Sequence, residues 1–107
     1  MLDFLLTEVE AELKASGFRC VHDQKHPHAF GSRELVWAGT KQAIRLVWDG
    51  KESWVRVQTR PSDGIKWKDI VLERVGRDGI DDAGRGRVVT ALRGFLQAPS
   101  DRGLTSA

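Results

Sequence analysis

Two stretches of apolar residues with helical spacing lie near the two ends of the chain. In the first, Leu5, Leu6, Val9 and Leu13 recur every three or four residues, which predicts an amphipathic helix over residues 3–16. Gly17 follows, and a glycine at this place commonly ends a helix. The second stretch predicts a helix over residues 87–97 that stops before Pro99. Its apolar side consists of Val88, Val89, Leu92, Phe95 and Leu96.

Between the two helices the pattern changes to the two-residue alternation of β-strands. It predicts strands over residues 18–22, 33–38, 43–48 and 54–60. The last two flank Asp49-Gly50, which is the chemistry of a tight hairpin turn. Residues 67–75 suit two structures, because Asp69 could cap a short helix while Ile70 and Val71 also suit a strand, and we favour the helix.

Alternation within the hairpin divides its residues between the two faces of the sheet. The side expected to meet the core carries Ile44, Leu46, Trp48, Val55, Val57 and Thr59. The opposite face carries Arg45, Val47, Trp54, Arg56, Gln58 and Arg60.

These elements predict an α+β fold, an antiparallel sheet of about four strands with the N- and C-terminal helices packed on one face. In this interpretation residues 1–97 form a single domain and residues 98–107 a flexible C-terminal tail. The length of 107 residues leaves no room for a second independent core. The uncovered face of the sheet is left to water or to a partner.

The composition indicates in which cellular compartment the protein is expected. No apolar run approaches the roughly 18 residues that a membrane span needs, and the apolar start lacks the basic segment of a signal peptide. The single cysteine, Cys20, excludes an internal disulfide and suits a reducing compartment. We therefore expect a cytoplasmic protein that has no membrane partner.

The net charge of +2 conceals a segregation along the chain. Residues 1–13 carry four acidic and no basic side chains, and residues 14–68 carry eleven basic and five acidic ones, a net charge of +6. Residues 69–107 are balanced, and all four tryptophans lie in the basic middle segment. A sheet with solvated Lys and Arg on its outer face explains this pattern, and a binding surface is the alternative.

Residue types that bind zinc occur close together at Cys20, His22, His26 and His28. Alternation places Cys20 and His22 on one side of their strand, but the spacing is not one of the usual zinc patterns. Cys20 also looks like a core-facing partner of Phe18. No metal site and no cofactor are predicted. An enzyme acting through the three histidines ranks last, because no nucleophile elbow or supported Cys-His pair accompanies them.

Two further motifs have a structural and a functional interpretation. Asp78, Asp81 and Asp82 suggest calcium, but the twelfth position of a calcium loop counted from Asp78 is Val89, so we expect Asp81 or Asp82 to cap the last helix instead. The run Gly84-Arg85-Gly86-Arg87 could hold an anion at a helix start, although it is not a P-loop. A flexible cationic loop is the interpretation that we favour.

The outer sheet face and the loop after it remain as the candidate working surface. Arg together with Trp is typical of protein interface hot spots. The same pair is typical of single-stranded nucleic-acid platforms, which need several exposed aromatic residues. Because Trp37 and Trp48 are expected to point inward, the pattern favours a protein interface. The predicted binding residues are Arg45, Trp54, Arg56, Gln58, Arg60, Lys66, Trp67 and Lys68.

Three stretches carry a resemblance to a family. They are Phe30-Gly31-Ser32-Arg33, then Ala43-Ile44-Arg45-Leu46-Val47-Trp48-Asp49-Gly50-Lys51 with Trp54, and Trp67-Lys68-Asp69. The chain in this region resembles small bacterial helix–sheet–helix (α-β-α) proteins, some of which are immunity proteins or antitoxin-like inhibitors encoded beside toxins. The likeness covers about two-thirds of the chain and consists mostly of hairpin and packing residues. It implies a non-enzymatic protein that binds and blocks another protein.

The first functional hypothesis is therefore a non-enzymatic protein-binding domain, including an immunity or inhibitor protein, whose basic Trp/Arg sheet face binds a protein partner with an acidic surface. The alternative is a nucleic-acid-binding module that uses the same face. Exposed strand edges would also allow a homodimer.

Overall fold

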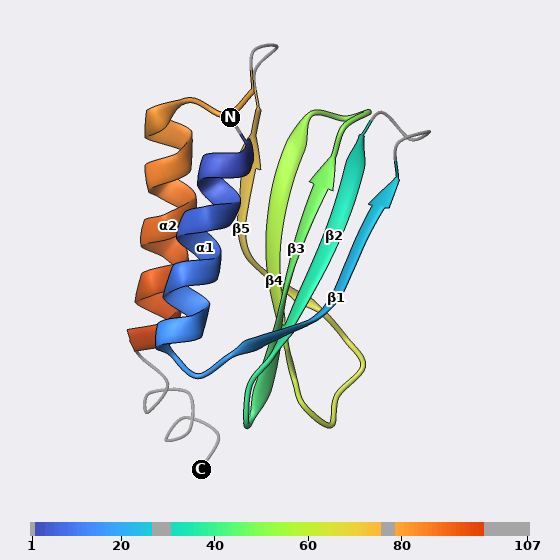
Figure 1. Ribbon diagram of the computed structural model, residues 1–107, viewed down its shortest axis with the longest axis vertical. Helices are drawn as coiled ribbons and strands as arrows, with labels where there is room; N and C mark the ends of the chain where they lie inside the picture. Colours follow the sequence, from blue (N-terminus) through green and yellow to red (C-terminus); the bar gives the residue numbers. More distant parts are fainter. Residues whose placement is uncertain (1, 27–30, 76–78, 98–107) are drawn as a thin grey trace.

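The part of the chain that the structure describes folds into one antiparallel sheet of five strands and two helices (Figure 1). In this computed structural model the described residues are 2–26, 31–75 and 79–97. The elements are α1 (Leu2–Ala15), β1 (Arg19–His26), β2 (Ser32–Ala38), β3 (Gln42–Asp49), β4 (Trp54–Pro61), β5 (Lys68–Arg74) and α2 (Asp82–Gln97). The strands pair in chain order, so the sheet is a meander. The predicted C-terminal tail, residues 98–107, lies outside the described residues.

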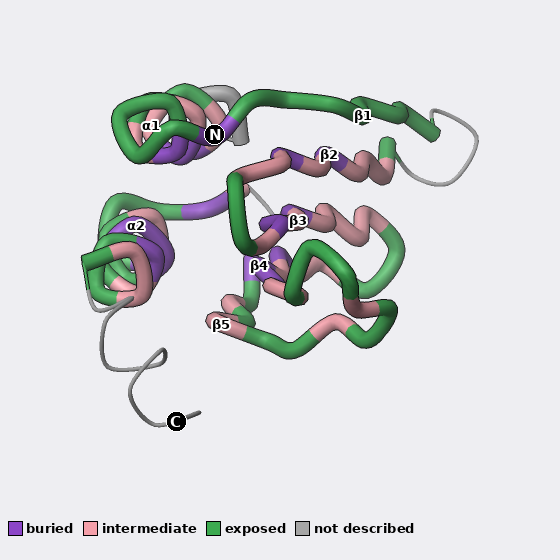
Figure 2. Tube along the Cα trace, turned by 90° about the horizontal axis from the view of Figure 1, so that it is seen from below, coloured by how far each residue is buried: buried purple, intermediate pink, exposed green. Residues whose placement is uncertain are grey.

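Both helices lie in one layer against one face of the sheet (Figures 1 and 2). Viewed end-on, α1 lies at the side of β1 and β2, whereas α2 lies at the side of β4 and β5 (Figure 2). Among the described residues, no helix lies on the other face of the sheet (Figure 2). The predicted α+β class and the helices on one face are therefore confirmed, and the number of strands is corrected from four to five.

The core lies between the helix layer and the sheet, where the helical stripes meet the alternating positions of the strands. The fully buried side chains come from both helices and from the three central strands: Leu5, Leu13, Leu92, Trp37, Ile44, Leu46, Val9, Val55, Val57 and Val88. Trp48 packs against this cluster and is partly buried. The expected inward set of the hairpin is thus confirmed.

Short-range hydrogen bonds end α1 after Gly17 and form the turn of the central hairpin after Asp49, as the sequence predicts. Gly17 has a φ of 86°, and the Phe18 amide donates a 2.9 Å hydrogen bond to the Leu13 carbonyl, which is the ending of a Schellman motif. In the hairpin, the Asp49 carboxylate accepts bonds from the amides of Lys51 and Glu52 at 3.0 and 2.9 Å. These bonds fold the connection between β3 and β4 back on itself.

Residues 68–74 form strand β5, so the predicted helix at 67–75 is wrong. The free edge of β4 offers a backbone ladder that pairs Trp54 with Arg74 at one end and Thr59 with Lys68 at the other. A short isolated helix has no comparable set of partners, since helix nucleation is unfavourable. A bulge at Ile70 interrupts the pairing between Val57 and Gln58.

The helix α2 begins at Asp82, five residues before the predicted start, so Gly84 to Arg87 form its first turns and not a loop. The Asp81 carboxylate accepts a 2.7 Å hydrogen bond from the Gly84 amide, which confirms the expected cap. A Cβ at Gly84 would lie 3.0 Å from the Asp81 carboxylate, 3.1 Å from Ile80 and 3.3 Å from the Glu73 carboxylate of β5, so a larger residue would have to push these side chains aside.

Strand β1 departs from simple alternation, because a bulge lies between Cys20 and His22. Cys20 pairs with Trp37 and Asp23 with Leu35, so both are on the helix side of the sheet. His22 is turned to the opposite face, where its ring nitrogen lies 3.2 Å from Glu34. The expectation that Cys20 and His22 share a side is therefore wrong, and Cys20 is exposed and not a core residue.

Burial of Leu46 generates a prediction about stability. Replacing this fully buried residue, Leu46→Ala, is expected to lower the free energy of unfolding by about 2–5 kcal/mol, because it removes apolar contacts and leaves a cavity. Leu72→Ala, in a side chain that is half exposed on β5, is the matched control and should change stability far less. Chemical denaturation measures both, and equal losses would contradict the assigned core.

A second prediction concerns acid stability. The Glu73 side chain, 13% exposed on β5, accepts bonds of 2.9 and 2.6 Å from Arg87 on α2. This hydrogen bond holds the pKa of the Glu73 carboxyl below its usual value of 4.5. The unfolded chain therefore takes up this proton first, and the stabilisation is present above pH 4.5 and is lost as the pH falls through the lowered pKa.

Glu73→Gln should accordingly weaken the dependence of unfolding free energy on pH below about 4.5. Glu52→Gln, in the exposed turn after β3, removes the same charge without this ion pair and is the control. Denaturant titrations at several acidic pH values measure the slope, and a slope that Glu73→Gln leaves unchanged would refute the role of the pair.

Candidate functional site

The uncovered face of the sheet carries the predicted binding residues of β3 and β4 and of the loop that leads to β5. We call this surface the Trp/Arg face and define it by Arg45, Trp54, Arg56, Gln58, Arg60, Lys66 and Trp67. Arg45 and Gln58 are direct register partners on adjacent strands, as are Ala43 and Arg60. The alternation of β3 and β4 therefore brings residues far apart in sequence onto one surface.

Arg45 lies at the centre of the Trp/Arg face and is engaged on all sides. Its guanidinium lies 4.4 Å from the centre of the Trp67 ring, a cation–π contact. Its Nε and one terminal nitrogen donate to the Gln58 side-chain oxygen at 2.9 and 2.5 Å, and the other terminal nitrogen lies 3.4 Å from Glu34. Arg45 is thus a structural centre of the face.

Burial lowers the pKa of the Arg45 guanidinium, and the neighbouring Arg56 and Arg60 lower it as well, while Glu34 opposes them. Arg56 and Arg60 therefore repel Arg45, and the Glu34 carboxylate offsets part of this repulsion.

Gln58 is 7% exposed, which makes it a buried polar residue on a face that the sequence predicts to be open. Its amide nitrogen donates a 3.0 Å bond to Asp69 on β5. With the pairs already described, a polar row crosses all five strands in the order His22, Glu34, Arg45, Gln58 and Asp69. The side-chain amide of Gln58 therefore accepts hydrogen bonds from Arg45 and donates one to Asp69.

Arg56 lies flat on a second tryptophan near the other end of β4. Its guanidinium is 4.4 Å from the centre of the Trp54 ring. Its Nε lies 3.3 Å from an oxygen of Asp69, within ion-pair distance, but this buried nitrogen has no hydrogen-bond acceptor. Arg56 therefore contacts Asp69 as an ion pair, and its Nε–H lies beneath the surface without a hydrogen bond.

Arg60 stacks on Trp67 together with Arg45, and it also bonds to the loop between β4 and β5. Its guanidinium lies 4.9 Å from the centre of the Trp67 ring and donates a 2.6 Å bond to the Gly64 carbonyl. Trp67 therefore receives two arginines. Lys66 is exposed next to it.

Lys68 does not join the Trp/Arg face. It pairs with Thr59, which shares its side of the sheet with the buried Val55 and Val57. Directly opposed residues in an antiparallel ladder point to the same face, so Lys68 points to the helix side.

The structure adds residues to this surface that the sequence interpretation omitted. Leu72 pairs with Arg56 and Arg74 with Trp54, so both lie on the Trp/Arg face, and Leu72 is 50% exposed. Ile65, in the loop before Trp67, is 88% exposed. Leu72 and Arg74 are absent from the predicted face because the sequence pattern favours a helix over residues 67–75. Glu34 could have been found, since it alternates with Val36, the register partner of Arg45, and so lies on the same face one diagonal position away.

The other candidate sites are not assembled. Among the described residues, no group of three or more His, Cys, Asp and Glu side chains is close enough to hold a metal ion, and Asp78 and His28 lie outside them. Arg85 and Arg87 of the predicted anion motif bind Glu8 at 2.8 Å and Glu73 at 2.6 Å. No described helix has the length and apolar character needed to cross a membrane.

Comparison of the chain with known protein families, with curated proteins and with solved structures finds no match. The resemblance to immunity-type proteins therefore stays a prediction.

The buried amide of Gln58 generates a prediction. Gln58→Leu keeps the approximate shape of the side chain but removes the acceptor of Arg45 and the donor to Asp69, so the free energy of unfolding should fall by about 1–3 kcal/mol. Gln24→Leu, on the exposed strand β1, is the matched control and should have little effect. Urea denaturation measures both, and similar effects of the two substitutions would contradict a structural role for the row.

Proposed function

We propose that this protein is a non-enzymatic binding domain whose Trp/Arg face receives an acidic surface of a protein partner. The observation that carries the proposal is the pair of arginine–tryptophan stacks, which holds guanidinium groups in place before any partner arrives. A side chain that is already ordered loses less conformational entropy on binding.

The composition of the surface supports a protein partner. Exposed Leu72 is the register partner of Arg56, and exposed Ile65 lies in the loop before Trp67. Both supply apolar area that phosphate groups would not cover. Trp and Arg are the residues most enriched among those that dominate interface energies. A mixture of apolar side chains and fixed cations is therefore the arrangement expected of a protein interface.

The charge balance of the surface supports an acidic partner. Glu34 and Asp69 lie next to Arg45 and Arg56 and partly neutralise them. Within the described part of the chain, Arg60, Lys66 and Arg74 have no carboxylate within ion-pair distance. This remaining positive charge would attract a negatively charged surface and raise the association rate.

The nucleic-acid alternative fits the geometry less well. Bases stack on free aromatic faces, but the Trp54 and Trp67 rings already carry arginine guanidiniums. Glu34 and Asp69 also lie within the surface and would repel phosphate groups. A protein partner avoids both difficulties.

The resemblance to immunity-type proteins implies one form of this function, in which the bound partner is a toxin and binding blocks its active site. The single cysteine suits a reducing compartment, so we propose that the two proteins meet in the cytoplasm.

The proposal predicts the outcome of a capture experiment in cells of the source organism. Tagged protein is expected to retain an acidic partner, and the double variant Trp54→Ala/Arg56→Glu should reduce its recovery at least about tenfold, because it removes one stack and reverses its charge. Lys51→Glu, in the exposed turn after β3, makes the same charge change away from the face and should leave recovery unchanged.

Circular dichroism establishes that each variant is folded before capture is compared. Equal recovery of the partner by the folded double variant would overturn the proposal. A fluorescence titration with single- and double-stranded oligonucleotides at about 50 mM salt, where phosphate contacts are strong, tests the alternative. Tight, salt-dependent binding there that the double variant abolishes would replace the protein partner with a nucleic acid.

A further inference from the structure

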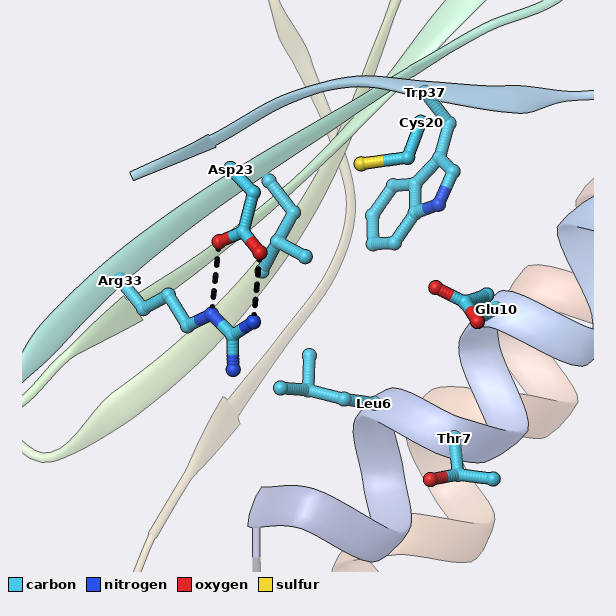
Figure 3. Close-up of a pocket in the computed structure, with 8 residues that line it drawn as sticks. Leu6, Thr7, Glu10, Cys20, Asp23, Arg33 and Trp37 are labelled. Atoms are coloured by element: carbon cyan, nitrogen blue, oxygen red, sulfur yellow. Dashed lines mark hydrogen bonds and ion pairs between the residues drawn. The ribbon is translucent and has the colours of Figure 1, made fainter. Parts of the chain in front are cut away.

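Two arginines of this protein hold a carboxylate side-on, through the edge of the guanidinium that carries Nε and Nη2. In the pocket of about 260 Å³ between α1 and the strands β1 and β2, Arg33 donates from these two nitrogens to the two oxygens of Asp23, at 2.9 and 2.8 Å (Figure 3). Arg87 makes the same pair of bonds to Glu73, at 2.9 and 2.6 Å. Two parallel bonds of this kind fix both the position and the orientation of a carboxylate.

Arg60 presents the same edge without a carboxylate on it. Within the described part of the chain, Arg60 donates hydrogen bonds from Nη1 alone, to the carbonyls of Gly64 at 2.6 Å and of Pro61 at 3.4 Å. It has no carboxylate there within ion-pair distance. Its Nε and Nη2 are not among the buried atoms that lack a partner, so this unpaired edge is open to solvent.

The Arg60 guanidinium is nevertheless held in place. It lies 4.9 Å from the centre of the Trp67 ring, and its bond to the Gly64 carbonyl ties it to the loop. Arg45 stacks on the same ring, but its Nε and Nη2 already donate to the Gln58 side-chain oxygen, at 2.9 and 2.5 Å. A planar fork that is oriented beforehand loses less conformational entropy for each hydrogen bond that it forms.

The loop beside this edge supplies a second charge and an apolar surface. Lys66 is exposed in the loop and adds a positive charge that attracts an anion. Ile65, its neighbour in the sequence, is 88% exposed and can cover an apolar group. The surroundings of Arg60 therefore suit an acidic residue that has an apolar residue next to it.

We infer that the Nε–Nη2 edge of Arg60 binds one Asp or Glu carboxylate of the protein partner, side-on, in the geometry that Arg33 and Asp23 share. An apolar residue of the partner next to that acid lies on Ile65. This inference rests on the proposed function and names the group of the acidic partner that the Trp/Arg face recognises. Arg60 is then a specificity-determining residue of the face.

Acetate tests the carboxylate site of the unaltered protein by NMR. During a titration at constant ionic strength, balanced with sodium chloride, the Arg60 Nε–H signal of the ¹⁵N-labelled protein should move downfield and saturate. The Trp67 indole N–H signal should respond with the same affinity, because its ring lies against the guanidinium. We expect a dissociation constant below about 100 mM, since a weaker value corresponds to less than one hydrogen bond to a charged group.

Arg60→Lys separates the fork from the charge, because lysine keeps the charge and lacks the planar pair of donors. It should abolish the saturable response of the Trp67 indole. Arg19→Lys makes the same exchange on the exposed strand β1, at the opposite edge of the sheet, and should leave the response unchanged. Absence of saturation up to about 100 mM acetate, or a response that Arg60→Lys retains, would overturn the assignment.

The capture experiment distinguishes this inference from the proposed function. Arg60→Lys should lower recovery of the acidic partner at least about tenfold, the change expected when one hydrogen bond between charged groups is lost, and Arg19→Lys should not. If Trp54→Ala/Arg56→Glu lowers recovery and Arg60→Lys does not, the binding face stands and the role of Arg60 is refuted. If neither variant lowers it, the proposed function is refuted as well.

Discussion

Burial of one face of a meandering sheet beneath two helices is the constraint on which the rest of the structure depends. Each fully buried Leu or Val contributes about 1.5–3 kcal/mol relative to exposure, and α1, α2 and the three central strands all supply such residues. Because side chains alternate along a strand, the residues between the buried ones must lie on the opposite face. The Trp/Arg face is the consequence of that alternation.

Charged side chains find their partners in different ways on the two sides of the sheet. On the outer face, three arginines stack on tryptophan rings, and carboxylates lie near two of them. The buried Gln58 links Arg45 to Asp69. On the helix side, the acidic residues of α1 bind arginines of α2, as in the pairs Glu8–Arg85 and Glu12–Arg93. The acidic start of the sequence therefore serves contacts between the helices.

Bulges in the two edge-strand pairings decide which side chains lie on each face of the sheet. The bulge at β1 sends Cys20 and Asp23 to the helix side and His22 to the outer face. The bulge at β5 places Asp69 beside Gln58 and keeps Val71 beside Val57 in the core. Both bulged pairs involve the edge strands, where such irregularities also discourage pairing with another chain.

The two helices, the Asp49-Gly50 hairpin and the inward set around Ile44 and Val57 can be predicted from the sequence alone, because these features rest on spacing and turn chemistry within a few residues. That residues 68–74 form a strand depends on the tertiary structure, since the free edge of β4 supplies their partners. The tertiary structure also decides that Gln58 is buried and that Trp37 carries an unpaired donor beside Glu10. The burial of Gln58 and the unpaired Trp37 donor depend on contacts between separate strands and helices, which the pattern of neighbouring residues in the sequence does not predict.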